Sequence, residues 1–215
     1  MTIVEDPDKR VRVVTMTPKE KERARNSTSL FLSPEARREV IREVGAERDL
    51  GVLIETGTNR GDTPWTLRDS FKQIHTIELD KALFTAAKQR FRGVNNVTCH
   101  RGDSTEVLPQ ILKGVNQSCL VWLDGHYSGP GTALGSESTP IREELGVLFN
   151  DRHKHVILVD DARCFYGGAE NPYDGEPLWD HYGTYPSLNW VEEQAKAHGY
   201  IYELKDDIIR LVPND

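Results

Sequence analysis

Several features are scarce in this 215-residue sequence, and each absence excludes a class of protein. Only three cysteines occur, Cys99, Cys119 and Cys164, and no two of them form a CxxC pair. So sparse and odd a set excludes a disulfide scaffold or a cysteine-rich zinc module. It is typical of a reducing compartment, so we expect a cytoplasmic protein.

Long apolar runs and an excess of basic residues are also missing. No window of about 18 apolar residues is present, so we expect no membrane span. Residues 1–14 contain no apolar segment of the kind that a secretory signal needs. The 34 acidic and 27 basic residues give a net charge of −7. This balance argues against a protein that coats nucleic acid, and no nucleic-acid partner is expected.

The sequence divides near residue 33. Residues 1–32 are polar and mixed in charge, and we interpret them as an N-terminal arm, or alternatively as a lid or dimer arm over the site. Nothing in their pattern separates these readings, and a monomer and a homodimer both fit. Residues 33–215 have a regular pattern that predicts one domain.

Within that domain, short apolar runs alternate with helical segments, and buried parallel strands have such continuous runs. The predicted strands are residues 52–56, 74–79, 97–100, 119–123 and 156–159. The predicted helices are residues 34–44, 81–92, 104–113, 140–150 and 187–198, the first beginning after Ser33 and ending at Gly45. Residues 200–204 and 208–212 form a closing hairpin. The alternation predicts an α/β fold with a doubly wound, mostly parallel sheet and a C-terminal antiparallel hairpin.

Ligands of such sheets bind beyond the carboxyl ends of the strands. The first strand runs into Glu55-Thr56-Gly57-Thr58-Asn59-Arg60-Gly61-Asp62-Thr63. Two glycines four residues apart let the backbone approach a ligand closely, although a tight turn also accounts for them. The loop is not GxGxxG, so the fingerprint of NAD-binding proteins is absent.

Acidic residues follow the next two strands. Glu78 closes the second strand and is placed to accept hydrogen bonds from ribose hydroxyls, whereas Asp80 suits the cap of the following helix. Asp103 follows the third strand. It fits contact with an adenine amino group, the cap of the helix that begins at Ser104, or both roles.

Taken in order, the ExGxxxG loop, the acid that closes the second strand and the Gly-Asp pair after the third resemble class I S-adenosylmethionine-dependent methyltransferases over about residues 33–215. The resemblance implies a Rossmann-like seven-stranded sheet and S-adenosylmethionine as cofactor. It also implies that the loop from Glu55 to Gly61 faces the methionine moiety, Glu78 the ribose and Asp103 the adenine. The cofactor-binding residues expected on this basis are Glu55, Gly57, Thr58, Asn59, Gly61, Asp62, Thr63, Glu78, Asp103, Ser104 and Asp124.

Three carboxylates follow the fourth and fifth strands, namely Asp124, Asp160 and Asp161. If these strands are neighbours, their ends lie about 5 Å apart, and the carboxylates repel unless one is protonated or a cation sits between them. All-oxygen ligands favour Mg²⁺, with Ca²⁺ or Mn²⁺ as alternatives. A solvated loop start with a helix cap would also explain the Asp-Asp pair.

These residues also resemble metal-dependent O-methyltransferases of the catechol and macrocin types. In those, an acid after strand four and an Asp-Asp or Asp-Asn pair after strand five bind the metal, which implies Asp124, Asp160 and Asp161 as ligands. The macrocin type has an Asp-x-Asp whose second Asp is a candidate base, and here that position is His126. Imidazole titrates near neutral pH, so we predict His126 and Asp124 as catalytic residues. A metal-ligand role and a structural role for His126 stay open.

Two long segments follow these residues: a glycine-rich one at 129–138, read as a lid, and an aromatic one at 163–186. The aromatic segment suits a sugar or planar substrate, or it packs over the edge of the sheet. We predict methyl transfer to a hydroxyl oxygen of a small-molecule acceptor. The alternatives are a metal-free N- or C-methyltransferase and a non-catalytic nucleotide- or metabolite-binding module on the same fold.

Overall fold

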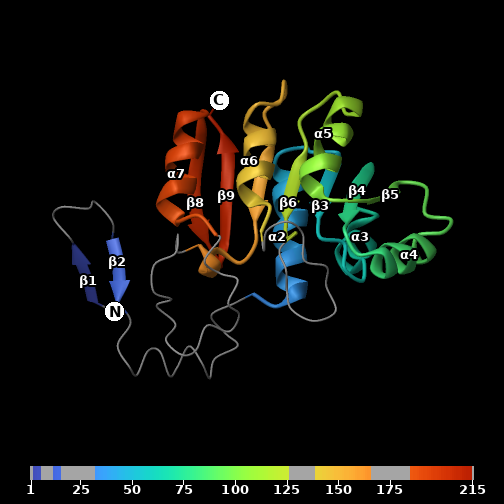
Figure 1. Ribbon diagram of the computed structural model, residues 1–215, viewed down its shortest axis with the longest axis horizontal. Helices are drawn as coiled ribbons and strands as arrows, with labels where there is room; N and C mark the ends of the chain where they lie inside the picture. The colour runs from blue at the N-terminus through green and yellow to red at the C-terminus, as the bar shows by residue number, and fades with distance from the viewer. Residues whose placement is uncertain (1, 6–11, 16–31, 126–138, 166–184, 215) are drawn as a thin grey trace.

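Figure 1 shows a computed structural model of the protein, which describes residues 2–5, 12–15, 32–125, 139–165 and 185–214. Near the N-terminus, β1 (Thr2–Glu5) and β2 (Arg12–Thr15) pair antiparallel as a two-stranded sheet. Within the described ranges no helix is both long and apolar enough to cross a bilayer. The role of residues 1–32 as an arm or lid stays a prediction.

A seven-stranded sheet forms the body of the domain, in the order β5-β4-β3-β6-β7-β9-β8. Its strands are β3 (Val52–Thr56), β4 (Gln73–Glu78), β5 (Val97–Arg101), β6 (Leu120–Leu123), β7 (Val156–Val159), β8 (Tyr200–Lys205) and β9 (Ile208–Pro213). The pairs among β3 to β7 are parallel, and β9 is antiparallel to both β7 and β8. The predicted doubly wound sheet with its C-terminal hairpin is confirmed.

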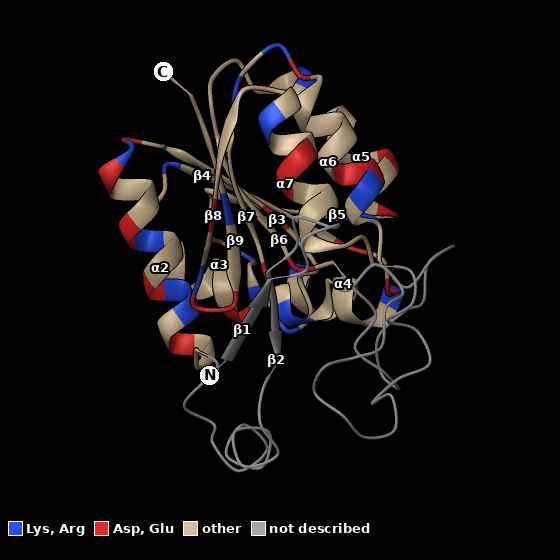
Figure 2. Ribbon diagram, turned by 90° about the vertical axis from the view of Figure 1, so that its left-hand side faces the viewer, with Lys and Arg blue, Asp and Glu red and all other residues tan. Residues whose placement is uncertain are grey.

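Helices cover both faces of this sheet (Figures 1 and 2). They are α2 (Pro34–Glu47), α3 (Asp62–Leu67), α4 (Lys81–Arg90), α5 (Ser104–Gly114), α6 (Ile141–Phe149) and α7 (Leu188–Ala197), with a short 3₁₀ turn η1 (Ala162–Cys164) after β7. One hydrophobic core lies between the sheet and α5, α6 and α7, and a second between the sheet and α2, α3 and α4. The central strands β3, β6 and β7 are buried along their whole length, which explains why their sequences are mostly apolar.

The prediction that Gly45 ends the first helix is wrong. The helix α2 continues to Glu47, and Arg48 is its C-cap. A Cβ atom on Gly45 would lie 2.7 Å from Cζ of Phe71, a ring of the core beneath the helix. Gly45 therefore allows close packing of the helix rather than its termination.

The hairpin between β8 and β9 turns through Asp206 and Asp207, as predicted. Both have positive φ, 58° and 62°, which a two-residue type I′ turn requires. The turn places the side chain of Asp207 beside η1, where its Oδ1 accepts from the backbone N–H of Arg163 at 2.8 Å.

The edge of the sheet contains a pair of histidines. His75 on β4 and His100 on β5 approach to 3.0 Å between Nδ1 of His75 and Nε2 of His100. Burial, with a smaller effect from His100, lowers the pKa of His75 from 6.5 to about 4, and burial also lowers the pKa of His100. The folded protein therefore holds His75 neutral at a pH where an unfolded chain protonates it.

This pair predicts a pH-dependent difference in stability between wild type and His75→Gln. As pH falls from 7.5 to 5, unfolded His75 gains a proton and folded His75 does not, so the free energy of unfolding of wild type drops relative to the variant. Denaturant titrations of both proteins at the two pH values measure the change. A difference that is the same at pH 7.5 and pH 5 would contradict the prediction.

Candidate functional site

The sequence-predicted residues gather at the carboxyl edge of the parallel strands. The chain runs outward from β3 through β4 to β5 and then returns to β6 on the other side of β3. This reversal makes the ends of β3 and β6 the switch point, where open α/β sheets bind ligands. The predicted acidic residues lie at or just beyond the carboxyl ends of the five parallel strands: Glu55 on β3, Glu78 on β4, Asp103 after β5, Asp124 after β6 and Asp160 after β7.

The glycine loop after β3 is fixed by backbone contacts on two sides. The N–H groups of Gly57 and Thr58 both donate to the carbonyl of Ile77 on β4 at 3.0 Å. Gly57 has a φ of 87°, and a Cβ there would lie 2.2 Å from the carbonyl oxygen of Asp124. Only glycine fits this crossing of the two chain segments.

The second glycine, Gly61, has a φ of 75° and precedes α3 as its N-cap. Here a Cβ would meet the ring of Phe91 at 2.9 Å. Asp62 of the same loop is turned to α4, where its Oδ1 accepts from Arg90 at 2.6 Å. Arg90 also donates to the carbonyl of Arg60 at 2.6 Å. Arg90 therefore connects the C-terminal part of the glycine loop, at Arg60 and Asp62, to α4.

Glu55 is buried beneath this loop. Its Oε2 accepts from the hydroxyl of Thr76 at 2.6 Å, and that hydroxyl lies 2.5 Å from the hydroxyl of Thr58. Burial raises the pKa of Glu55 to about 8; the hydrogen bonds from Thr76 and Thr63 oppose the rise and the charge of Asp124 adds to it. Glu55 is therefore placed to support the loop from below, at 2% exposure.

Glu78 accepts two backbone hydrogen bonds at the end of β4. Its Oε2 takes the N–H of Asn59 at 2.7 Å, and its Oε1 takes the N–H of Asp80 at 2.8 Å. Each carboxylate oxygen has a second lone pair that can accept a hydrogen bond from a hydroxyl group. Asp80 caps α4 through the N–H groups of Ala82 and Leu83, as predicted.

Asp103 caps α5, which confirms one of its two predicted roles. Its Oδ1 accepts from the backbone N–H of Thr105 at 2.9 Å and from the Thr105 hydroxyl at 2.8 Å. Among the described residues no hydrogen bond reaches its Oδ2. Ser104, the next residue, is buried at the start of the helix.

At the other half of the site, Asp124 and Asp160 end neighbouring strands. The N–H of Asp160 donates to the carbonyl of Leu123 at 3.0 Å, and the N–H of Asp124 donates to Thr56 at 3.1 Å. Burial raises the pKa of Asp160, as do the charges of Asp124 and Asp161, and Arg37 opposes the rise. The predicted crowding of carboxylates is therefore present.

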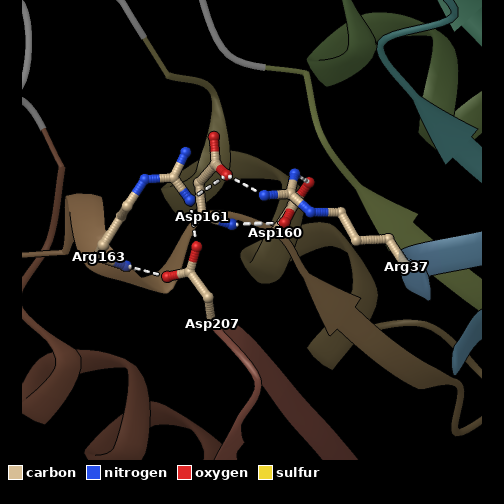
Figure 3. Close-up of polar contacts among 5 residues, drawn as sticks. All are labelled: Arg37, Asp160, Asp161, Arg163 and Asp207. Carbon is tan, nitrogen blue, oxygen red and sulfur yellow. Dashed lines mark hydrogen bonds and ion pairs between the residues drawn. The ribbon is translucent and has the colours of Figure 1, made fainter. Parts of the chain in front are cut away.

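Two arginines contact Asp160 and Asp161 (Figure 3). Arg37 on α2 contacts Asp160 through Nη1 and lies 3.3 Å from Oδ1 of Asp161 through Nη2. Arg163 on η1 lies 2.7 Å from the same Oδ1 and also contacts Asp207. Within the ranges that the structure describes, no three His, Cys, Asp or Glu residues are arranged to hold a metal ion. His126 and the segment 129–138 lie outside those ranges, as do residues 166–184 of the predicted aromatic segment.

A small pocket opens between the ends of β6 and β7 and the first turn of α6. Its lining includes Gly125, Glu144, Asp160, Phe165 and Tyr185. Burial raises the pKa of Glu144 to about 7. The pocket thus lies beside Asp160, and its lining contains two carboxyl groups, those of Glu144 and Asp160.

Sequence reasoning missed Arg37 and Glu144. Glu144 had a detectable signal, because Ile141, Glu144, Leu145 and Leu148 form one helical stripe that is otherwise apolar. Arg37 had none: it is one of several arginines on an amphipathic helix, and only the fold brings it to Asp160.

With this geometry, the chain has the Rossmann-like fold of S-adenosylmethionine-dependent methyltransferases, and the resemblance indicated by the sequence motifs is confirmed in its fold. The similar solved structures include the SAH-bound Podospora anserina methyltransferase PaMTH1 (TM-score 0.59, 13% identity, 94% of this chain and 90% of that chain covered). A proposed caffeoyl-CoA O-methyltransferase from Staphylococcus aureus has a TM-score of 0.60 at 13% identity, covering 90% and 96%. The Streptomyces achromogenes O-methyltransferase TomG, solved with SAM, has a TM-score of 0.53 at 15% identity, covering 94% and 93%. No protein-family model and no curated protein sequence matches the chain.

The glycine loop yields a prediction that separates backbone strain from steric fit. Gly57 and Gly93 have nearly the same φ, 87° and 86°, but no atom lies within 4 Å of a Cβ built on Gly93. An alanine at either position must adopt a left-handed conformation, which destabilises the folded state by about 1–2 kcal/mol. Gly57→Ala also forces Asp124 away, which adds roughly 1–3 kcal/mol of overpacking.

Thermal melting of Gly57→Ala and Gly93→Ala checks this difference. We expect the melting temperature of Gly57→Ala to fall well below that of Gly93→Ala. If the two variants melt at the same temperature, the close contact between Gly57 and Asp124 is not present in solution.

Proposed function

We propose that the protein transfers a methyl group from S-adenosylmethionine to a hydroxyl oxygen of a small molecule. The observation that carries the proposal is the junction of the Gly57 loop with Glu78 at the ends of β3 and β4. At this junction the backbone of the loop can approach a ligand closely. The Glu78 carboxylate beside it can accept hydrogen bonds from ribose hydroxyls. The neighbours PaMTH1, solved with SAH, and TomG, solved with SAM, support the choice of cofactor.

The described residues fit this cofactor. Gly57 and Gly61 hold positive φ, so the loop between them presents backbone without side chains at its two bends. Glu78 would hold the ribose hydroxyls and Asp103 the adenine amino group through oxygens beyond those used in the helix cap. Asp124 lies between the residues that would hold the cofactor and the Asp160–Asp161 pair, beside which the acceptor would bind. When bound, the cofactor supplies a methyl carbon activated by a sulfonium.

The chain contributes orientation and proton removal. Direct displacement needs the acceptor oxygen in line with the methyl carbon and the sulfur. Such positioning accounts for a large part of the rate acceleration in methyl transfer. The acceptor would lie beside Asp124 and Asp160, which end the neighbouring strands β6 and β7. We assign His126 to accept the proton of the acceptor hydroxyl, with Asp124 as the second catalytic residue beside it.

A divalent metal does not fit the described carboxylates as they are arranged. The sequence predicts Mg²⁺ at Asp124, Asp160 and Asp161, but Asp160 and Asp161 hold Arg37, and Asp161 also holds Arg163. We therefore assign no step of the reaction to a metal.

Calorimetric titration with S-adenosylhomocysteine tests the cofactor assignment. Wild type should bind at micromolar levels or tighter, and Glu78→Ala should bind at least tenfold more weakly, a loss of about 1.4 kcal/mol or more. Glu106→Gln is the matched control, because Glu106 is an exposed carboxylate on α5 at the same edge of the sheet. Equal affinity in Glu78→Ala and wild type would remove the ribose role from Glu78.

Labelled methyl donor tests the acceptor assignment. Incubated with a panel of hydroxylated sugars, phenols and polyketides, the protein should label at least one hydroxyl. A matched panel of amines serves as control. Label that appears on amines alone would make the protein an N-methyltransferase.

A further inference from the structure

The side chain of Arg37 reaches from α2 to the two carboxylates that follow β7. It comes from 123 residues away in the sequence, and its guanidinium contacts both Asp160 and Asp161 (Figure 3). The side chain of Arg37 is 21% exposed, whereas those of Asp160 and Asp161 are 1% and 8% exposed. Arg37 therefore contacts both carboxylates, whereas Arg163 contacts Asp161 of this pair.

A divalent cation at this pair would need the oxygens that Arg37 holds. Mg²⁺ binds carboxylate oxygens at about 2.0–2.1 Å and uses their lone pairs directly. Oδ2 of Asp160 faces Nη1 of Arg37, and Oδ1 of Asp161 lies between Arg37 and Arg163. The positive charge of the guanidinium also repels a second cation at such short range.

Arg163 is held differently. It is bound to Asp207 through its guanidinium and through its backbone N–H, which ties η1 to the turn of the β8–β9 hairpin. Removing Arg37 would leave that anchor in place. Arg37 is thus the cation that can be exchanged without loosening the connection between β7 and the hairpin.

We infer that the Arg37 guanidinium takes the place of a divalent cation at the Asp160–Asp161 pair. The inference rests on the proposed function. It means that the part of the site that would bind the acceptor contains a permanent positive charge from Arg37. An arginine stays protonated at all physiological pH values, so a chelator cannot remove this charge.

Binding of Mn²⁺ to the full chain, followed by electron paramagnetic resonance, tests the inference. Arg37→Gln should bind Mn²⁺ at least tenfold more tightly than wild type, and the gain should disappear in Arg37→Gln/Asp160→Asn. Arg42→Gln is the matched control, because Arg42 lies on the same helix and pairs with Glu39 instead. Equal Mn²⁺ affinity in wild type and Arg37→Gln, whether both bind or neither does, overturns the inference.

A comparison of wild type with Asp160→Asn does not depend on the folding of Arg37→Gln. We expect the Mn²⁺ affinity of wild type and of Asp160→Asn to be the same, because Arg37 already occupies the Asp160 carboxylate in wild type. Sub-millimolar binding that this substitution abolishes would overturn the inference. Neither titration contains the methyl donor or its product, so failure here is distinct from failure to bind S-adenosylhomocysteine.

Discussion

The site depends on one close backbone contact, between Gly57 and the carbonyl of Asp124. It occurs where β3 and β6 separate, and the N–H of Asp124 donates to Thr56 one residue earlier at 3.1 Å. The contact leaves no room for a side chain at position 57, since a Cβ would lie 2.2 Å from the Asp124 oxygen. Because of it, the glycine loop lies directly against the backbone of Asp124. A donor bound on the loop and an acceptor beside Asp124 would therefore be neighbours.

Buried carboxylates surround this contact, and each has its own compensation. Burying an ionised carboxyl without a partner is costly, so the group pairs, accepts hydrogen bonds or takes a proton. Glu78 accepts two backbone N–H groups and Asp160 holds Arg37. Glu55 accepts a hydrogen bond from the Thr76 hydroxyl, and burial raises the pKa of Glu55 to about 8 and that of Glu144 to about 7, which favours their neutral forms. The edge of the sheet can thus collect many acidic residues without unfolding.

The fold was predictable because its signals are local. Continuous apolar strands, Ser and Asp caps and the Asp206–Asp207 turn act over a few residues, and the structure confirms them. The position of the glycine loop and Glu78 at the edge of the sheet was predictable because the topology brings the carboxyl ends of parallel strands together. A strand-end residue can therefore be assigned to the site without knowledge of side-chain contacts.

The partners of the carboxylates were not predictable in the same way. Arg37 meets Asp160 only through the packing of α2 on the sheet, and nothing in the sequence near either residue records that packing. Glu144 could have been found, because it interrupts an apolar stripe. Gly45 was misread because a glycine in a helix can serve close packing as well as termination, and its neighbour Phe71 is 26 positions away.

A crystal structure with bound S-adenosylhomocysteine tests the central claim most directly. The account predicts the nucleoside over the ends of β3 and β4, with a ribose hydroxyl within about 3.2 Å of a Glu78 carboxylate oxygen, an ordinary hydrogen-bond distance. Its amino-acid portion should lie against the backbone between Gly57 and Gly61. A nucleoside bound elsewhere on the protein, or crystals that exclude it at saturating concentration, would contradict the account.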